Sequence, residues 1–516
     1  MPINPIIMLS EYYQPDSIMR RHIIEKFSAD KSPSYIEFGL RSLLGFKPTV
    51  SRQSVFDEDL LKLNRTKNYR LSGVIALVLS LPISVVLSIM VILNCSIKSL
   101  SNRKKFFFNI LRSKYRGVTL GDCVGGVFLR SGDSEGRLNA NISFFKILHR
   151  IYLLAIFLDL FLVFSRLNKL RPGYFYICEL NAGSEACRRI LLKHNFVELR
   201  YNYEVGKFKQ IQEKLEACEI IKSEFNAETQ SPFDPIKTKE KIRSLVFRET
   251  SYHLLVDCDV DKDLKLSISD VDDVKSVFGR KVAIIFLHQV SDAAYVFGLD
   301  CFVDLDDWLF QSIKILNACN IAVIVKLHPA FFSETMTYPI DIRYLDFLNR
   351  TFDVDLERIE QGKIHKSNKL NAMFVQHKTP LLELSRSFPD FLCVTHHGTV
   401  ATEAAYLGHV VAVNDASPYR NNHKFVNIYS SLDEYSCLVK SWANGTLKQD
   451  PEAETSLLRY VHNRQNIVDH ERWMETFRNS LGFSFAKEKA FITHLEGVQR
   501  NSAEYLAIHK FFDKIF

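Results

Sequence analysis

The segment Val394–Asn414, VTHHGTVATEAAYLGHVVAVN, constrains the fold of this 516-residue chain more than any other. It reads as the end of a strand, a polar loop, a helix over about 400–407 that stops at Gly408, and a second buried strand. In such a turn the free N–H groups and the positive dipole end of the helix point at an anion above the sheet. Gly398 lets a phosphate approach the backbone closely, and Glu403 could accept hydrogen bonds from ribose or sugar hydroxyls. The segment is therefore predicted to hold a nucleotide diphosphate.

Two further predicted strands end in polar residues. The run Ile321–Pro329 (IAVIVKLHP) has Lys326 and His328 at its C-terminal end. The run Lys281–His288 (KVAIIFLH) ends in His288. In open α/β folds, ligands bind at the carboxyl ends of the parallel strands. We therefore expect the three strand ends to converge on one crevice.

Strands and helices alternate through this half of the chain, which predicts a parallel, doubly wound sheet. The expected order is strand 282–288, helix 305–317, strand 321–327, and then strand 391–394 with its helix. The polar and charged stretch 339–378 is expected to lie over one edge. Upstream, a strand is expected at 174–178 and a helix at 184–193.

Composition limits the class of protein. A chain of this length with 47% hydrophobic residues can bury two ordinary cores, and residues 224–239, with two prolines in a polar run, read as a linker. The ten cysteines include no C-x-x-C pair, which argues against a disulfide scaffold or a zinc ribbon. Residues 1–13 lack the charged start and cleavage site of a signal peptide, so a reducing cytoplasm is the simplest location.

Several motifs resemble one known family. Lys-Leu-His-Pro at 326–329, followed by His-Gly-Thr-x-x-x-Glu-x-x-x-x-Gly at 397–408, resembles the C-terminal half of bacterial surface-polysaccharide glycosyltransferases of the GT-B type, which act in capsule and lipopolysaccharide biosynthesis. The segments IFLHQVSDAAYVFG, DLDDWLFQSI and YRGVTLGDCVGGVFLR resemble the same group, so the similarity spans roughly 115–435.

The resemblance implies an α/β, GT-B-like fold with two Rossmann-like domains facing a cleft. Residues 1–230, with the apolar segment 71–97, would form an acceptor-binding domain, and 231–280 a linker and domain entry. Residues 281–485 would bind the nucleotide-sugar, and 486–516 would form a C-terminal helical segment.

The implied reaction moves a sugar from a nucleotide-activated donor to a lipid-linked or oligosaccharide acceptor. Donor binding is expected from seven residues: His288, Lys326, His328, His397, Gly398, Thr399 and Glu403. Lys326 and His328 would balance charge on the leaving phosphate. The first candidate for the general base is Asp122, with Glu179 and Glu185 behind it. No Asp-x-Asp pair is placed to carry a divalent ion, so we expect metal-independent chemistry and no cofactor besides the nucleotide-sugar co-substrate.

Other readings remain open. His396 and His397 could be a metal pair, although adjacent histidines on an extended loop point in different directions. A nucleotide-sugar epimerase or a glycerophosphate transferase could use the same scaffold. A non-catalytic, membrane-associated assembly protein is the third alternative, because Cys-Val-Gly-Gly follows Asp122 where the family carries an aromatic–acidic pair. The motifs are compatible with CMP-, UDP- and GDP-linked donors and do not identify the acceptor, the linkage or the oligomeric state.

The net charge of +7 is unevenly distributed. Between Lys62 and Arg116 lie eleven Lys and Arg and no acidic residue, flanking the uncharged segment Leu71–Ile97. This segment is long enough to cross a bilayer, and Pro82 is expected to kink it or to turn a shallow hairpin, either in lipid or buried in the N-terminal domain. The basic flanks predict a location on the cytoplasmic side of the inner membrane, peripheral or single-span. A second apolar block, 151–164, is too short to span a bilayer and is expected to form a core or interfacial helix. Nucleic acid is not an expected partner, because no reader motif is present.

Overall fold

A computed structural model of the chain describes residues 6–10, 35–39, 61–63, 67–99, 102–131, 133–167, 172–177, 182–202, 207–211, 234–246, 281–290, 295, 298–328, 331, 339–361, 363–376, 378–419 and 424–462. The chain divides into two compact units. The first includes Met1–Val124 and Asn141–Ala217, and the second includes Gly125–Ala140 and Cys218–Arg464. The predicted C-terminal helical segment, 486–516, and most of the predicted linker, 231–280, lie outside the described residues.

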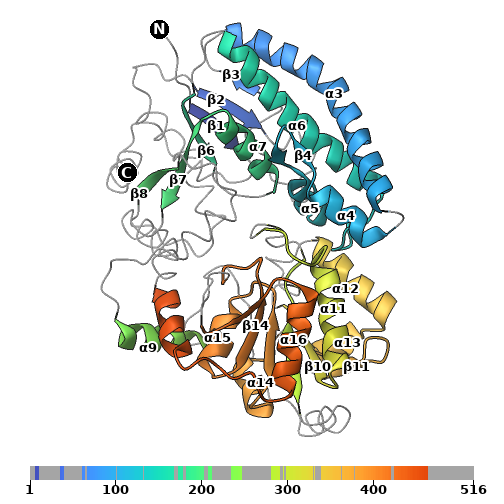
Figure 1. The fold of residues 1–516 in the computed structure, drawn as a ribbon, viewed down its shortest axis with the longest axis vertical. Helices are drawn as coiled ribbons and strands as arrows, with labels where there is room; N and C mark the ends of the chain where they lie inside the picture. The colour runs from blue at the N-terminus through green and yellow to red at the C-terminus, as the bar shows by residue number, and fades with distance from the viewer. Residues whose placement is uncertain are drawn as a thin grey trace. The chain divides into compact units, whose positions relative to one another are not determined.

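The second unit is built on a seven-stranded sheet of order β11-β12-β10-β9-β13-β14-β15 (Figure 1). All neighbouring strands are parallel except β11, which runs antiparallel to β12 at one edge. Numbered from β9 and without the edge strand β11, the order is 3-2-1-4-5-6, the dinucleotide-binding Rossmann order, whose ligand crevice lies where strands 1 and 4 meet. The strands are β9 (Val282–Phe286), β10 (Ala322–Lys326), β11 (His365–Ser367), β12 (Ala372–Val375), β13 (Leu392–Thr395), β14 (Val410–Asn414) and β15 (Asn427–Tyr429).

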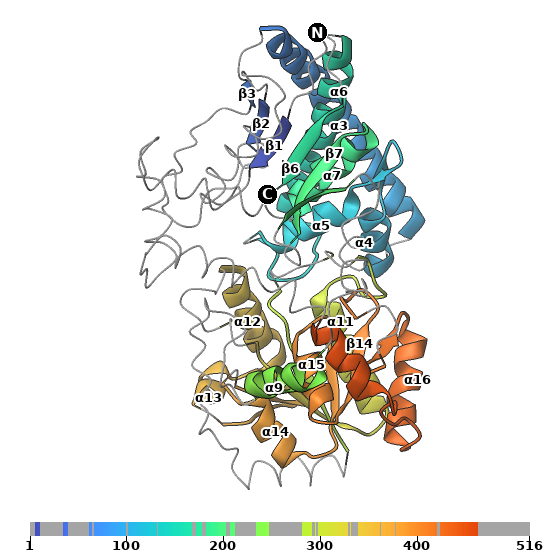
Figure 2. The ribbon, with the colours of Figure 1, turned by 90° about the vertical axis from the view of Figure 1, so that its left-hand side faces the viewer.

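Helices cover both faces of this sheet, so its strands are apolar on both sides. In β9, Ala283 and Ile285 pack into one core with Trp308, whereas Ile284 and Phe286 pack into the other core with Ala401. Figure 2 shows the helices of this unit around its sheet. They are α9 (Pro235–Val246), α11 (Leu305–Ala318), α12 (Pro339–Phe352), α13 (Leu356–Glu360), α14 (Leu381–Ser387), α15 (Val400–Tyr406) and α16 (Leu432–Ala443).

The predicted alternation of strands and helices in this unit is confirmed, with one correction. The stretch 339–378 was expected to lie over an edge, yet it contributes β11 and β12 to the sheet itself, together with α12 and α13. Both strands are short, three and four residues, and therefore give no periodic signal in the sequence.

A short excursion, Gly125–Ala140, belongs to the second unit although the chain on either side of it belongs to the first. The N–H of Leu138 donates to Asp304 Oδ2 at 2.7 Å, and the guanidinium of Arg137 lies 4.0 Å from the ring centre of Phe347. The predicted boundary at 230 assigned this stretch to the N-terminal domain.

The first unit contains a six-stranded sheet of order β3-β2-β1-β6-β7-β8. The four central strands are parallel, and the edge strands β3 and β8 are antiparallel to their neighbours. Numbered from β1, this is again the order 3-2-1-4-5-6. The strands are β1 (Ile6–Ser10), β2 (Tyr35–Gly39), β3 (Leu61–Leu63), β6 (Tyr174–Ile177), β7 (Val197–Asn202) and β8 (Lys207–Ile211), and a small hairpin is formed by β4 (Lys114–Tyr115) and β5 (Val118–Thr119). Two Rossmann-like sheets are thus present, while the cleft between them remains a prediction.

Two long helices, α3 and α6, pack side by side in the first unit (Figures 1 and 2). Helix α3 runs from Lys67 to Ser99 without a break, so the predicted hairpin at Pro82 is wrong. Helix α6 spans Ile142–Leu167 and is longer than the 151–164 block suggested, although it is mostly buried as expected. By length and composition, Leu71–Ser99 and Ile142–Leu167 are both able to cross a membrane. The other helices are α4 (Arg103–Leu111), α5 (Gly121–Leu129) and α7 (Ala182–Lys193).

Candidate functional site

The candidate site lies where β9, β10 and β13 end. In the sheet register, Phe286 of β9 pairs with both Lys326 of β10 and Thr395 of β13, so the three parallel strands end level with one another. His288 follows the first strand, His328 the second, and His396 and His397 the third. This is the position at which the strand order reverses, and the prediction that the three strand ends lie together is confirmed.

The imidazole rings gather at these strand ends. The ring of His288 stacks on that of His397 with centroids 4.1 Å apart, and the ring of His328 lies 6.4 Å from that of His288. His288 Nε2 lies 3.1 Å from Thr395 Oγ1 and accepts the backbone N–H of His397 at 3.4 Å. The backbone of the loop after β13 is therefore tied to the side chain that follows β9.

Burial controls the charge of two of these histidines. Desolvation is the main cause that lowers the pKa of both His288 and His397 well below the usual range, and the neighbouring imidazoles lower it further. Both rings are consequently neutral at neutral pH and can act as hydrogen-bond partners, not as cations. Lys326 is the last residue of β10 and is only 8% exposed. Its ammonium group, unlike these two rings, can supply a positive charge at the strand ends.

A carboxylate fixes the fourth histidine. His396 Nε2 lies 2.5 Å from Asp300 Oδ2, and its Nδ1 lies 2.8 Å from Nδ1 of His397. A carboxylate on one ring nitrogen sets which tautomer the imidazole adopts, so Asp300 orients His396 and, through it, His397. Asp300 is not found by sequence reasoning, because it lies 96 residues from its partner and belongs to no motif.

The metal-pair alternative gains no support from this geometry. Among the residues that the structure describes, no three His, Cys, Asp or Glu side chains are grouped to hold a metal ion. His396 and His397 instead bond to each other, with their rings perpendicular.

Gly398 is required by close packing. A Cβ atom at this position would lie 2.8 Å from Thr395 Oγ1 and 2.9 Å from His288 Cε1. The hydroxyl of Tyr419, which is fully buried, donates to the carbonyl oxygen of Gly398 at 2.9 Å. The N–H of Gly398, predicted to face a phosphate, donates to Thr395 Oγ1 at 3.3 Å. The loop is therefore held by the protein itself, and a phosphate would have to compete for this donor.

The helix that follows is short. α15 covers seven residues, and its N-terminal residue Thr399 makes no capping hydrogen bond through its side chain. Glu403 is only 4% exposed, so it is not a solvated position on the surface of the helix. Its carboxylate lies near the thiol of Cys393, where its charge adds to the burial that raises the pKa of that thiol.

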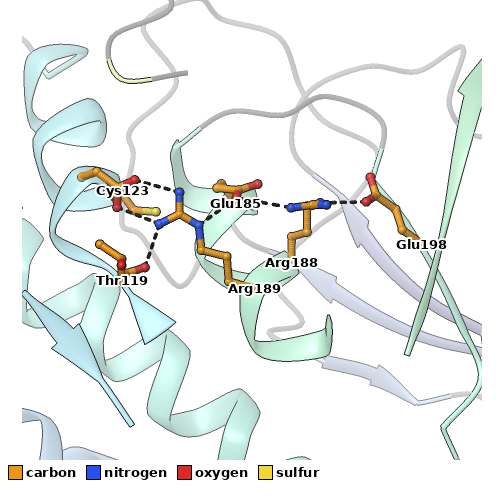
Figure 3. A network of polar contacts seen from close by, with 7 residues as sticks. Thr119, Cys123, Glu185, Arg188, Arg189 and Glu198 are labelled. Atoms are coloured by element: carbon orange, nitrogen blue, oxygen red, sulfur yellow. Dashed lines mark hydrogen bonds and ion pairs between the residues drawn. The ribbon is translucent and has the colours of Figure 1, made fainter. Parts of the chain in front are cut away.

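Two of the three candidate bases, Asp122 and Glu185, lie in a buried network of arginines and carboxylates (Figure 3). The two oxygens of Asp122 accept hydrogen bonds from Arg189 at 2.8 and 2.7 Å, and Arg189 Nε donates to Glu185 at 2.7 Å. Arg188, fully buried, joins Glu185 to Glu198 at 3.4 and 2.7 Å. These charge-assisted hydrogen bonds hold the carboxylate of Asp122 in a fixed orientation.

The structure thus gives Asp122 and Glu185 structural partners within the first unit. Their roles as general base stay predictions. The third candidate, Glu179, lies outside the described residues.

Comparisons with known proteins find similarity among solved structures, at low sequence identity. No family matches the sequence, and no curated protein matches it. The chain is similar to the crystal structure of Anabaena Alr3699/HepE in complex with UDP, at 12% sequence identity and a TM-score of 0.27, over 64% of this chain and 77% of that chain. A TM-score this low carries no argument, so the proposal below depends on the topology and on the site.

Proposed function

We propose that this protein is a glycosyltransferase whose second unit binds a nucleotide-activated sugar at the carboxyl ends of β9, β10 and β13. One observation carries the proposal: polar side chains from three strands meet at the switch point of a sheet with Rossmann order. Ligands bind at this position in open α/β sheets. The resemblance of the motifs at 326–329 and 397–408 to GT-B polysaccharide glycosyltransferases supports the same class.

The residues at the strand ends suit the departure of a nucleoside diphosphate. Negative charge grows on the leaving phosphate as the glycosidic bond breaks, and donors already placed there stabilise the transition state. Lys326 and His328 would carry that task, with His288 and the backbone at Gly398 and Thr399 around them. The neutral ring of His397, whose Nδ1–H points at His396, would offer Nε2 as a hydrogen-bond acceptor without adding a positive charge. Glu403 would accept a sugar or ribose hydroxyl.

The acceptor side of the proposal rests on the resemblance. A carboxylate of the first unit, Asp122 or Glu179, would take the proton from the acceptor hydroxyl as general base. The acceptor would be a lipid-linked or oligosaccharide precursor of a surface polysaccharide, used on the cytoplasmic side of the inner membrane. The reaction would need no metal ion.

The test is thermal stabilisation of the detergent-purified full chain by CMP, CDP, UDP, GDP and ADP. At about 100 times its Kd, a ligand of the folded state adds about 2.7 kcal/mol, which raises the Tm of a unit of this size by roughly 5–10 °C. We expect one nucleotide to produce this shift and the His328→Ala variant to lose it. The matched control is His365→Ala, because His365 lies on the edge strand β11 and its Nε2 bonds to the carbonyl oxygen of Asp353.

The outcomes separate the alternatives. Absence of a shift with every nucleotide, for a folded sample, contradicts the donor site. Interconversion of a UDP-sugar without any acceptor identifies an epimerase, and selective nucleotide binding without turnover on any acceptor identifies an assembly protein.

A further inference from the structure

Helix α3 has the polarity of a water-soluble helix turned inside out. Its outward face carries large apolar side chains that are between 37% and 73% exposed. They are Leu71, Val74, Ile75, Val78, Leu79, Leu81, Ile83, Val85, Val86, Ile89, Met90, Leu93 and Ile97. A soluble monomer rarely exposes a continuous apolar patch of more than a few hundred Å², so a face of this length requires an apolar partner.

The inward face of α3 carries the small and polar residues. At a spacing of four, Ser72, Ala76, Ser80, Ser84 and Ser88 are all at most 5% exposed. Such a stripe lets two helix backbones approach closely, which is how helices pack where no water drives them together. The hydroxyls of two of these serines donate to carbonyl oxygens of their own helix one turn back, at 2.9 and 2.8 Å. The hydroxyls of Ser80 and Ser84 are therefore satisfied within α3 itself, and α3 packs along α6.

Positive charge surrounds both ends of the apolar face. Lys67 and Arg70 precede it, and beyond its end the side chains of Lys98, Arg103 and Lys105 are exposed. No acidic residue occurs between Lys62 and Arg116. An apolar face with basic flanks complements a surface of anionic lipid, in which each nearby Lys or Arg contributes about 1 kcal/mol.

We propose that α3 lies in the plane of an anionic membrane, with its outward face at the boundary between headgroups and acyl chains and α6 behind it. A transmembrane arrangement of α3 would bring α6 into the hydrocarbon with it. Asp159 of α6 is fully buried and bonds to Tyr115 at 2.9 Å, Arg116 at 2.7 Å and His194 at 2.7 Å. Arg116 is itself more than half exposed, and a charged group is costly at the centre of a bilayer.

The burial of the two helices agrees with this arrangement. Only 22% of the apolar stretch of α3 is buried, against 67% for α6. One helix thus faces outward and the other faces the fold, as expected for a helix that lies on a membrane. The proposal is independent of the proposed transferase activity.

The first test is flotation of the full chain with vesicles of phosphatidylcholine, with and without phosphatidylglycerol. We expect stronger binding to the anionic vesicles, and binding reduced by at least about tenfold in the variant Val78→Gln/Met90→Gln, since burying one such side chain contributes about 1.5–3 kcal/mol. Both side chains are exposed, so the fold is retained, which circular dichroism checks. The matched control is Ile236→Gln, an equally exposed apolar residue of the second unit, which should leave vesicle binding unchanged.

The second test measures depth. Tryptophan is introduced singly at Val74, Val86 and Leu93, all exposed on α3, and its fluorescence is quenched by lipids brominated at different acyl positions, with the unsubstituted protein as background. An in-plane helix places the three probes at one depth. A deep probe at Val86 between two shallow ones shows a transmembrane helix and contradicts the proposal. The proposal is also overturned if the chain fails to bind vesicles and forms a dimer that the double glutamine variant dissociates. That result shows that a second copy of the chain covers the outward face of α3.

Discussion

The variant Gly398→Ala tests whether the loop after β13 and the histidine after β9 form one packed site. The added methyl group would lie 2.8 Å from Thr395 Oγ1 and 2.9 and 3.1 Å from two ring atoms of His288. These separations are below van der Waals contact. His288 has little room to withdraw, because it is 6% exposed and stacks on His397 at 4.1 Å.

The magnitude follows from two opposing terms. Inserting a methyl group into a packed site typically costs about 1–3 kcal/mol. Replacing glycine by alanine stabilises the folded state by about 0.4–1 kcal/mol, because the unfolded chain becomes less flexible. This gain applies here because the backbone at Gly398 is not in the left-handed region. We expect a net loss of about 1–2 kcal/mol in the free energy of unfolding, or roughly 3–8 °C in Tm. Displacing the stacked rings should also weaken nucleotide binding by about tenfold, equivalent to one strong hydrogen bond.

The assay measures thermal unfolding and nucleotide titration on the same samples. Gly445→Ala is the control: its φ of 73° makes alanine strained, yet no atom lies within 4 Å of the added methyl group. It should lower the free energy of unfolding by a similar amount, about 1–2 kcal/mol, and leave nucleotide binding intact. In a His288→Ala background the penalty of Gly398→Ala should shrink, with a coupling energy of about 0.5–3 kcal/mol. If Gly398→Ala unfolds and binds nucleotide as the unsubstituted chain does, the packing argument is refuted.

Three further predictions concern stability. Arg189→Met should lower the free energy of unfolding by about 3–5 kcal/mol, because it leaves two buried carboxylates without the cation that they share. Arg350→Met, at an exposed ion pair, should lower it by less than about 1 kcal/mol. Burial lowers the pKa of His409 to about 4, so the unfolded chain takes up this proton at a higher pH than the folded chain does. The free energy of unfolding should therefore be unaffected above about pH 6.5 and should fall by on the order of 3 kcal/mol as the pH drops to 4. His409→Leu should remove this part of the pH dependence. Gly121→Ala should prevent the first unit from folding, because the new Cβ would lie 1.7 Å from the carbonyl oxygen of Ile110.

Each of these has a direct readout. Calorimetry compares the two arginine variants, and equal Tm values for both would contradict the buried-network argument. Chemical unfolding between pH 4 and pH 7 follows the histidine, and an unchanged slope in His409→Leu would show that another group titrates. Circular dichroism and solubility report on the folding of Gly121→Ala. A native-like Tm would contradict the close approach of α5, which begins at Gly121, to Ile110 of α4.

The sequence was sufficient to place His288, His328 and His397 together, because parallel strands of one sheet share their carboxyl edge and local patterns reveal where strands end. It was insufficient for contacts between distant residues. The pairing of Asp300 with His396 and of Asp122 with Arg189 joins positions 96 and 67 residues apart, and no local pattern encodes either. The sequence left open whether Pro82 kinks one helix or turns a hairpin, because proline usually disrupts a helix and the packing of α3 on α6 is not encoded locally; the structure shows one helix.

The excursion Gly125–Ala140 limits how this protein can be cut into separately folding fragments. The second unit is encoded in two separate stretches of the gene, and the smaller one supplies the N–H that Asp304 accepts at the start of α11. A fragment that begins at residue 218 would therefore lack part of its own fold. Moving this unit into another protein would require both segments, Gly125–Ala140 and Cys218–Arg464.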